Sequence, residues 1–159
     1  MLSQPWSESE RLSALRSLKI LNTPPEAHFD TICRIAQTLF GVPIALIPLV
    51  EEHDLWFKAK CGLNADGAPR DIAFCNYTIL SDDVLVVEDT RRDPRFCDNP
   101  LVTGELGVRF YAGAPLALPS GLRLGTLCII DTKPRPFSPE QVRQLRDLAE
   151  VISVRRQMI

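Results

Sequence analysis

Leucines near the start of the chain recur with the period of a helix. They stand at every third position from Leu12 to Leu21, so one stripe of the predicted helix is apolar. Ser7 and Glu10 have the spacing of a capping box, in which each side chain bonds the backbone of the other. The pattern predicts a first helix that packs against a core or a partner helix.

Two further helices are predicted by the same period. Thr23, two prolines and Glu26 resemble a helix start, with Thr23 as the cap, and Gly41 marks the end. The predicted inner face of this second helix carries Phe29, Ile32, Ile35, Ala36, Leu39 and Phe40. The last helix begins at a capping box of Ser138 and Gln141. Its apolar face is formed by Val142, Leu145, Leu148, Ile152 and Ile159.

Between these helices the apolar residues form runs or alternate, which is typical of strands. Residues 44–50 are almost purely apolar and predict a central strand covered on both faces, with a bulge or bend at Pro48. Residues 55–61 alternate, which places Phe57, Ala59 and Cys61 on one face of a second strand. Residues 108–118 and 122–131 predict a long hairpin around a Pro-Ser-Gly turn.

The middle of the chain is less regular. Residues 62–73 are expected to be a loop, 73–80 fit a helix or a strand equally, and 84–88 predict a short strand. Asp93-Pro94 and Asn99-Pro100 each have the pattern of a helix cap followed by proline, so two short helices are expected, the second ending at Gly104.

The order of these elements predicts an α+β fold. Strands joined by short connections favour one central antiparallel sheet of five or six strands. The N- and C-terminal helices are expected to cover one face of this sheet. Residues 62–107 would then cover the other face as a roof of loops and short helices, an arrangement that favours a small-molecule pocket. All 159 residues are expected to form one domain, with its core at about residues 8–154.

Composition excludes several classes of partner and location. Apolar residues make up 45% of the chain, charged residues 24%, and the formal net charge is -2. Neither nucleic acid nor a membrane is therefore an expected partner. The chain has five cysteines, an odd number, and its polar start carries no signal-like apolar stretch. These features favour a cytoplasmic protein with reduced thiols.

Several stretches, taken in order, resemble the GAF domain family, whose fold is PAS-like. The resemblance runs from about residue 8 to residue 154. It is carried by residues 20–26, 42–46, 55–59, 73–75, 109–116 and 124–131, the last of which read Leu-Gly-Thr-Leu-Cys-Ile-Ile-Asp. They are most similar to the GAF domains at the front of bacterial sensor histidine kinases and diguanylate cyclases.

This resemblance implies a sensory or regulatory input module and not an enzyme. Such domains bind small molecules or form homodimers, and they pass a conformational change along a terminal helix to an output domain. A possible output domain would be a kinase or cyclase, which this sequence does not contain, so an isolated input domain, a stand-alone regulator and an excised piece of a longer protein all stay open. A homodimer through the terminal helices is expected, because both ends carry apolar helix faces.

The sequence departs from the family at the positions after Phe74 and Cys75. Many relatives carry a small residue and then histidine there, whereas this chain has Asn76 and Tyr77. Bilin-binding relatives attach the chromophore through cysteine, commonly beside a histidine, so bilin is not expected as a cofactor. The motif of cyclic-nucleotide-binding relatives is also missing, and no other cofactor is predicted.

Cys75 is the thiol of greatest interest, because it falls where the roof meets the pocket in related domains. A reactive thiol needs neighbours that favour its thiolate, and a buried, inert cysteine is the alternative interpretation. Some relatives reduce free methionine sulfoxide with pocket cysteines, so a redox sensor or reductase that pairs Cys75 with Cys97 or Cys61 stays open. Cys128 lies in an apolar run and is interpreted as core.

Polar residues near the roof supply the other candidates. Asp89 and Arg95 belong to a charged cluster that would either hold an anionic ligand or form solvated surface ion pairs. Arg109 and Tyr111 are predicted to point the same way from a central strand, where the arginine needs a carboxylate such as Asp89 or a ligand. The candidate ligand-binding residues are Cys75, Tyr77, Asp89, Arg95, Phe96, Arg109, Tyr111 and Thr126.

Three functions remain open at this point. The first is a sensor of a small molecule, the second a dimerisation module with an empty pocket, and the third a thiol-based redox sensor or enzyme. The two histidines, His28 and His53, lack the spacing of metal ligands, so no metal site is predicted.

Overall fold

The computed structural model describes the backbone of residues 7–157 and the side chains as far as residue 152. The helices, helical turns and strands along the chain are α1 (Glu8–Ser17), α2 (Ala27–Phe40), β1 (Ile44–Val50), β2 (Asp54–Cys61), β3 (Gly67–Pro69), η1 (Arg70–Ile72), α3 (Cys75–Thr78), β4 (Leu85–Val87), η2 (Thr90–Arg92), α4 (Pro100–Thr103), β5 (Phe110–Ala117), β6 (Arg123–Asp131) and α5 (Pro139–Gln157).

The strands form one antiparallel sheet in the order β3-β2-β1-β6-β5-β4, which confirms the predicted sheet. The hairpin of β5 and β6 occupies its centre together with β1. β3, within the predicted loop, was not expected, because its three residues Gly-Ala-Pro show no alternation. It adds to the free edge of β2, where Leu55 pairs with Ala68.

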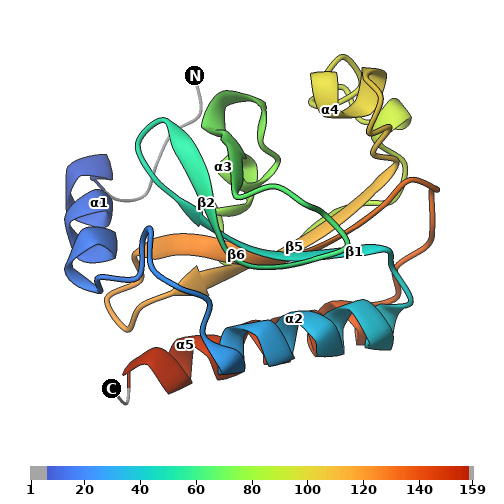
Figure 1. Ribbon diagram of the computed structural model, residues 1–159. Coiled ribbons are helices and arrows are strands. Elements are labelled where there is room, and N and C mark those ends of the chain that lie inside the picture. The colour runs from blue at the N-terminus through green and yellow to red at the C-terminus, as the bar shows by residue number, and fades with distance from the viewer. Residues whose placement is uncertain (1–6, 158–159) are drawn as a thin grey trace.

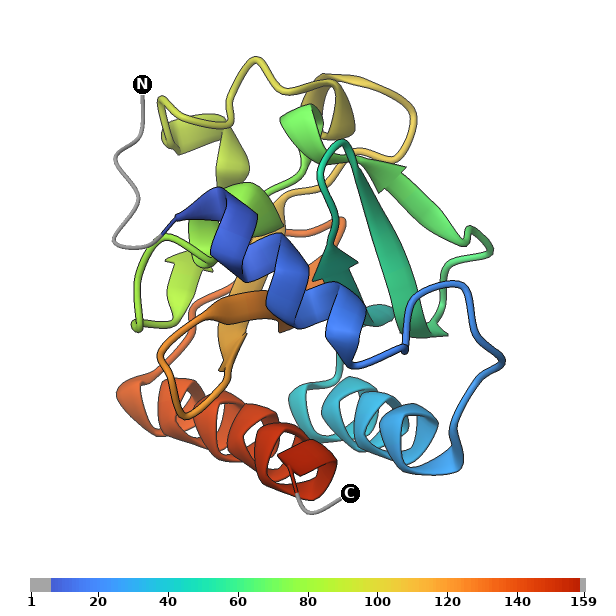
Figure 2. The same cartoon turned by 90° about the vertical axis from the view of Figure 1, so that its left-hand side faces the viewer.

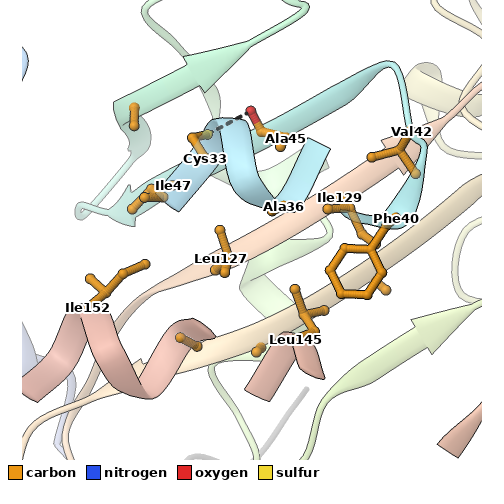
Figure 3. Packing of buried hydrophobic residues seen from close by; sticks show 14 of the residues in the cluster. Cys33, Ala36, Phe40, Val42, Ala45, Ile47, Leu127, Ile129, Leu145 and Ile152 are labelled. Carbon is orange, nitrogen blue, oxygen red and sulfur yellow. Dashed lines mark hydrogen bonds between the residues drawn. The ribbon is translucent and has the colours of Figure 1, made fainter. Parts of the chain in front are cut away.

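One face of the sheet is covered by α2 and α5, which lie beside each other beneath the strands (Figure 1). Figure 3 shows the core between these layers, where Leu145 of α5 and Phe40 of α2 lie close to Leu127 and Ile129 of β6. The predicted capping box at the start of α5 is confirmed. The Ser138 hydroxyl accepts from the backbone N–H of residue 141 at 3.2 Å, and the Gln141 side chain accepts from that of residue 138 at 2.8 Å.

α1 does not share that face. It lies across one end of the sheet (Figure 2), where Leu15 and Ile20 pack with Leu49 and Leu124 in a separate apolar cluster. The expectation that both terminal helices cover one face therefore holds for α5 and fails for α1. The physical reason is the connection after α1, which turns sharply at two non-glycine residues with left-handed backbone, at positions 19 and 22.

α2 begins later than predicted and buries a different stripe. Its cap is Glu26 and not Thr23, whose hydroxyl donates instead to the carbonyl of Ile20 at 2.7 Å. The predicted end at Gly41 is confirmed, with φ 62°. Ile35 and Leu39 were expected in the core but are 44% and 48% exposed. The buried positions are Phe29, Cys33, Ala36 and Phe40.

A β-bulge changes which side chains of β2 face the roof. Ile47 pairs with Ala59 and the next residue, Pro48, pairs with Phe57, so Lys58 is the extra residue. The predicted irregularity at Pro48 is confirmed, but the predicted common face of Phe57 and Ala59 is wrong. Phe57 packs under the roof, whereas Ala59 packs against the helices.

The roof over the opposite face consists of η1, α3, η2, α4 and the turns between them (Figure 1). The ambiguous segment 73–80 forms the short helix α3. The Asn99 side chain caps α4 by accepting from the Leu101 N–H at 2.8 Å, as predicted. Asp93 starts only a hydrogen-bonded turn, so the helix expected there is not formed.

Candidate functional site

A cavity of about 230 Å³ lies between the sheet and the roof. Its walls are hydrocarbon except for two thiols and one phenol. They come from the floor of the sheet, the segment before α3 and the segment after α4. The lining residues are Leu46, Pro48, Leu55, Phe57, Leu63, Ala65, Gly67, Ala68, Ala73, Phe74, Cys75, Leu101, Leu106, Val108, Tyr111, Cys128 and Ile130. Such a cavity favours a small and mainly apolar molecule.

Aromatic rings hold the roof in place beside the cavity. Phe74 and Phe96 stack with ring centroids 4.3 Å apart, and Tyr77 meets Phe96 edge-on at 5.0 Å. The Arg95 guanidinium lies over the Phe96 ring, 5.1 Å from its centroid. Both the stacked and the cationic contact are favourable. These residues therefore shape the roof, and only Phe74 among them reaches the cavity wall.

Cys75 is the centre of a buried cluster of thiols and hydroxyls. Its sulfur lies 3.4 Å from the Thr126 hydroxyl and 3.6 Å from the Tyr111 hydroxyl, which itself lies 2.8 Å from the Thr78 hydroxyl. Space for the Tyr111 ring comes from Gly113, where a Cβ atom would lie only 2.2 Å from the Tyr111 oxygen. The cluster thus joins α3 in the roof to β5 and β6 in the sheet.

The acidity of the two cavity thiols differs because of how they are bonded. A hydrogen bond from Cys128 is the largest influence on Cys75 and lowers its pKa, and the hydroxyls of Thr126 and Tyr111 act in the same direction. Together these bonds outweigh burial, which raises it. The same bond to Cys75, followed by burial, raises the pKa of Cys128 well above its ordinary value. Cys75 is therefore the thiol that more readily forms a thiolate.

The remaining cysteines lie away from this cluster. Cys33 is a buried residue of α2, and its thiol donates to the carbonyl of Ala45 at 3.1 Å (Figure 3). Burial and then the neighbouring Cys61 raise the pKa of Cys33 strongly. Cys97 is half-buried in the turn after η2. The thiol that bonds Cys75 is Cys128. The hypothesis that Cys75 pairs with Cys61 is corrected, because Cys61 packs on the opposite face of the sheet, and Cys97 lies outside the cavity lining.

The structure separates the sequence candidates into three groups. Cys75 and Tyr111 line the cavity, and Thr126 is fully buried behind them. Tyr77 and Phe96 belong to the roof packing. Asp89, Arg95 and Arg109 lie outside the cavity lining. Sequence reasoning missed two cavity residues. Cys128 lies in an apolar run, which gives no sign of which residue borders a cavity. Phe57 was assigned to the other face, because the bulge was not placed on β2.

The charged candidates make local contacts. Asp89 accepts from the Arg91 side chain at 3.0 Å, and Asp93 accepts from the Arg95 side chain at 2.7 Å. Both arginines are about half exposed, so these ion pairs fit the solvated surface interpretation. Arg109 donates to the carbonyl of Val102 at 2.8 Å, so its partner is a backbone group and not a carboxylate.

Arg70 connects the roof to α1. Its guanidinium donates to the Asn76 side chain at 3.0 Å, to the carbonyl of Glu51 at 3.1 Å, and to the Glu8 carboxylate by a short contact. Glu8 also accepts from Arg11 at 2.9 Å. Partial burial alone would raise the pKa of Glu8, but the bonds and charges of the two arginines outweigh it and lower the pKa from 4.5 to about 2.

Replacing Glu8 with glutamine should destabilise the fold in a pH-dependent way. The folded-state pKa lies below the unfolded value, so the stabilisation is complete above about pH 4.5 and is lost as the pH falls through about 2. Urea unfolding of the wild type and of Glu8→Gln should show a difference in the free energy of unfolding that is constant from pH 7 to 5 and shrinks toward pH 2. Glu10→Gln, on the same first turn and exposed, is the control. A gap that stays constant down to pH 2 would contradict the ion-pair assignment.

The described part of the chain offers no other obvious chemistry. Among its residues, no group of three or more histidine, cysteine or carboxylate side chains could hold a metal ion. None of its helices carries an apolar stretch long enough to cross a bilayer.

Comparison with known proteins gives a relative by sequence and several solved structures with the same fold. The cyclic di-GMP phosphodiesterase PA2567 of Pseudomonas aeruginosa is 41% identical over 158 residues, which cover 98% of this chain but only 27% of that protein. This chain thus spans about a quarter of its relative.

Two solved structures share the fold at low identity. The GAF domain of an Acinetobacter phosphoenolpyruvate-protein phosphotransferase has a TM-score of 0.68 at 19% identity, covering 96% of this chain and 95% of that one. Free methionine-R-sulfoxide reductase of Neisseria meningitidis has a TM-score of 0.67 at 17% identity, covering 99% and 96%. The sequence pattern that defines the GAF domain matches residues 24–155. Because that match spans most of the sequence and the fold agrees, the chain belongs to the GAF domain family.

Proposed function

We propose that this chain is a sensory module whose cavity binds a small, mainly apolar molecule. The observation that carries the proposal is the cavity itself, which has about 230 Å³ of space between walls that are hydrocarbon apart from two thiols and one phenol. That space equals about eight water molecules in the liquid, but the walls offer water few hydrogen-bonding partners. An apolar ligand would therefore gain from leaving bulk water.

The proposed output is a conformational signal to a further domain. The relative from Pseudomonas aeruginosa is a cyclic di-GMP phosphodiesterase, and this chain matches about a quarter of it. By this likeness, the module would regulate a signalling enzyme, such as one that handles a cyclic dinucleotide or a histidine kinase, in the cytoplasm. It would act by population shift and would not itself be an enzyme. The size of the cavity also supports the expectation that bilin, with its four linked rings, is not the ligand.

A second copy of the chain is the proposed partner of the helical face. α2 and α5 leave Ile35, Leu39 and Val151 about half exposed, and Ile32 and Val151 line a shallow groove between the two helices. Native mass spectrometry of freshly purified protein would report the oligomeric state and any co-purified molecule together. A ligand-free dimer would favour the dimerisation module over the sensor.

Filling the cavity should abolish the response to a ligand. We expect Ala68→Leu, on the cavity wall, to fold and to lose the rise in melting temperature that a small apolar ligand gives the wild type. At a free ligand concentration of about 100 times the Kd, binding stabilises the folded protein by about 2.7 kcal/mol. For a domain of this size this corresponds to a rise in melting temperature of roughly 5–10 °C.

The matched control is Ala14→Leu, which is also half-buried but lies on α1 outside the cavity. It should keep the full response in differential scanning fluorimetry with the co-purified molecule or a panel of small cyclic ketones. An equal response in both variants would place the ligand elsewhere and overturn the proposal.

A further inference from the structure

The cavity contains very few reactive atoms, and they lie together. Among its lining side chains, only Cys75, Cys128 and Tyr111 carry a sulfur or oxygen atom. All three are at least 95% buried, so a molecule reaches them through the cavity and not from the surface. A ligand that fits the apolar walls is thereby held against a thiol.

Resting on the proposed ligand-binding function, we infer that Cys75 captures small apolar electrophiles of the α,β-unsaturated carbonyl class inside this cavity. The sulfur that would react is the one that lines the cavity and receives the hydroxyl contacts of Thr126 and Tyr111 at 3.4 and 3.6 Å. The Tyr111 hydroxyl donates to this sulfur, and the Thr126 hydroxyl lies within hydrogen-bond distance of it. Donors of this kind stabilise the thiolate, which is the nucleophilic form.

The step needs no further reactant. Cys75 gives up its thiol proton, its sulfur forms a bond to the β-carbon of the ligand, and the carbon–carbon double bond becomes single. The α-carbon then takes up one proton, so that the adduct has the summed mass of protein and ligand. No electron donor or acceptor is involved. Binding beside the sulfur raises the effective concentration of the two reactants.

The other thiols are the internal controls for this inference. Cys97 and Cys61 are more exposed than Cys75, and neither lines the cavity. Cys33 is as deeply buried as Cys75 but lies on the opposite face of the sheet, where its pKa is raised. Reaction governed by exposure alone would modify Cys97 or Cys61 first, so the order of labelling separates the two explanations.

The experiment treats the native, full chain with cyclohex-2-en-1-one and follows the adduct by intact mass and peptide mapping. We expect the first adduct on Cys75, formed at least about tenfold faster than that on Cys97. Thr126→Val should slow this reaction and move its pH–rate profile upward, whereas Cys97→Ser should leave it unchanged. First labelling of Cys97 or Cys61, or labelling of Cys75 only in urea, would overturn the inference.

Cyclohexanone, the saturated analogue, distinguishes failure of this inference from failure of the proposed function. If cyclohexanone raises the melting temperature of the wild type but not of Ala68→Leu, while Cys75 stays unmodified by the enone, the cavity binds ligands and only the covalent step is wrong. If neither ketone alters the melting temperature and Cys75 does not react, both proposals fail for this class of ligand. Labelling of Cys75 that cyclohexanone slows by competition supports both.

Discussion

Replacing Gly125 with alanine should destabilise the protein by about 3 kcal/mol or more. Gly125 lies in β6 between Leu49 of β1 and Leu116 of β5. A Cβ atom there would stand 2.2 Å from the carbonyl oxygen of Pro48 and 3.1 Å from the Leu49 Cα atom. Both are backbone atoms of a central strand, so no side-chain rotation relieves the clash and the two strands must separate. The measurement is urea unfolding followed by circular dichroism.

Gly121→Ala is the control for this prediction. Gly121 lies in the hairpin turn with φ 89°, and a Cβ atom there meets nothing within 4 Å. It therefore isolates the cost of a left-handed backbone, about 1 kcal/mol, from the cost of a clash. If the two variants lose the same stability, β1 and β6 do not approach each other as closely at Gly125 as described.

Replacing Lys58 with methionine should cost about 2–3 kcal/mol. The Lys58 ammonium group is buried and donates to the Thr23 hydroxyl at 2.6 Å and to the carbonyl of Pro24 at 3.0 Å, and its distance to a Glu26 carboxylate oxygen is 2.8 Å. Methionine has a similar shape but no charge, so three polar groups lose their contact with the ammonium group. Removing one partner of a buried pair typically costs about 3–5 kcal/mol. The estimate here is lower because Glu26 is one-third exposed.

The matched variant is Lys60→Met, two residues farther along β2. Lys60 pairs with Asp66 at 2.8 Å, but Asp66 is 80% exposed, so the expected loss is below about 1 kcal/mol. Chemical denaturation of both variants at pH 7 compares the two sites directly. Equal losses would mean that water reaches Lys58 in the folded protein.

Sequence patterns predicted the elements whose signals are local. The run at residues 44–50, the hairpin of β5 and β6, the stop at Gly41 and the capping box at Ser138 each depend on neighbouring residues, and all are found. The failures involve distant contacts. The face of Phe57 depends on how β2 pairs with β1, and the position of α1 depends on two left-handed residues that sequence does not mark.

The candidate site was predictable only in part for the same reason. Cys75 and Tyr111 could be named from the segments that carry them, but the contact of Cys75 with Cys128 joins residues far apart in the chain. Asp89 and Arg95 were candidates because of their charge, but at the surface Asp89 pairs with Arg91 and Arg95 pairs with Asp93. An apolar cavity leaves no polar motif in a sequence, because its walls have the composition of an ordinary core.

β6 gives the two layers of the molecule a common support. Cys128 lines the cavity, while its neighbours Leu127 and Ile129 point to the other side and pack in the same cluster as Leu145 of α5. The cavity and the C-terminal helix α5 therefore lie on opposite faces of the sheet, with only β6 between them at this point. A displacement of the backbone at Cys128 would therefore also alter the packing of Leu127 and Ile129 beneath α5.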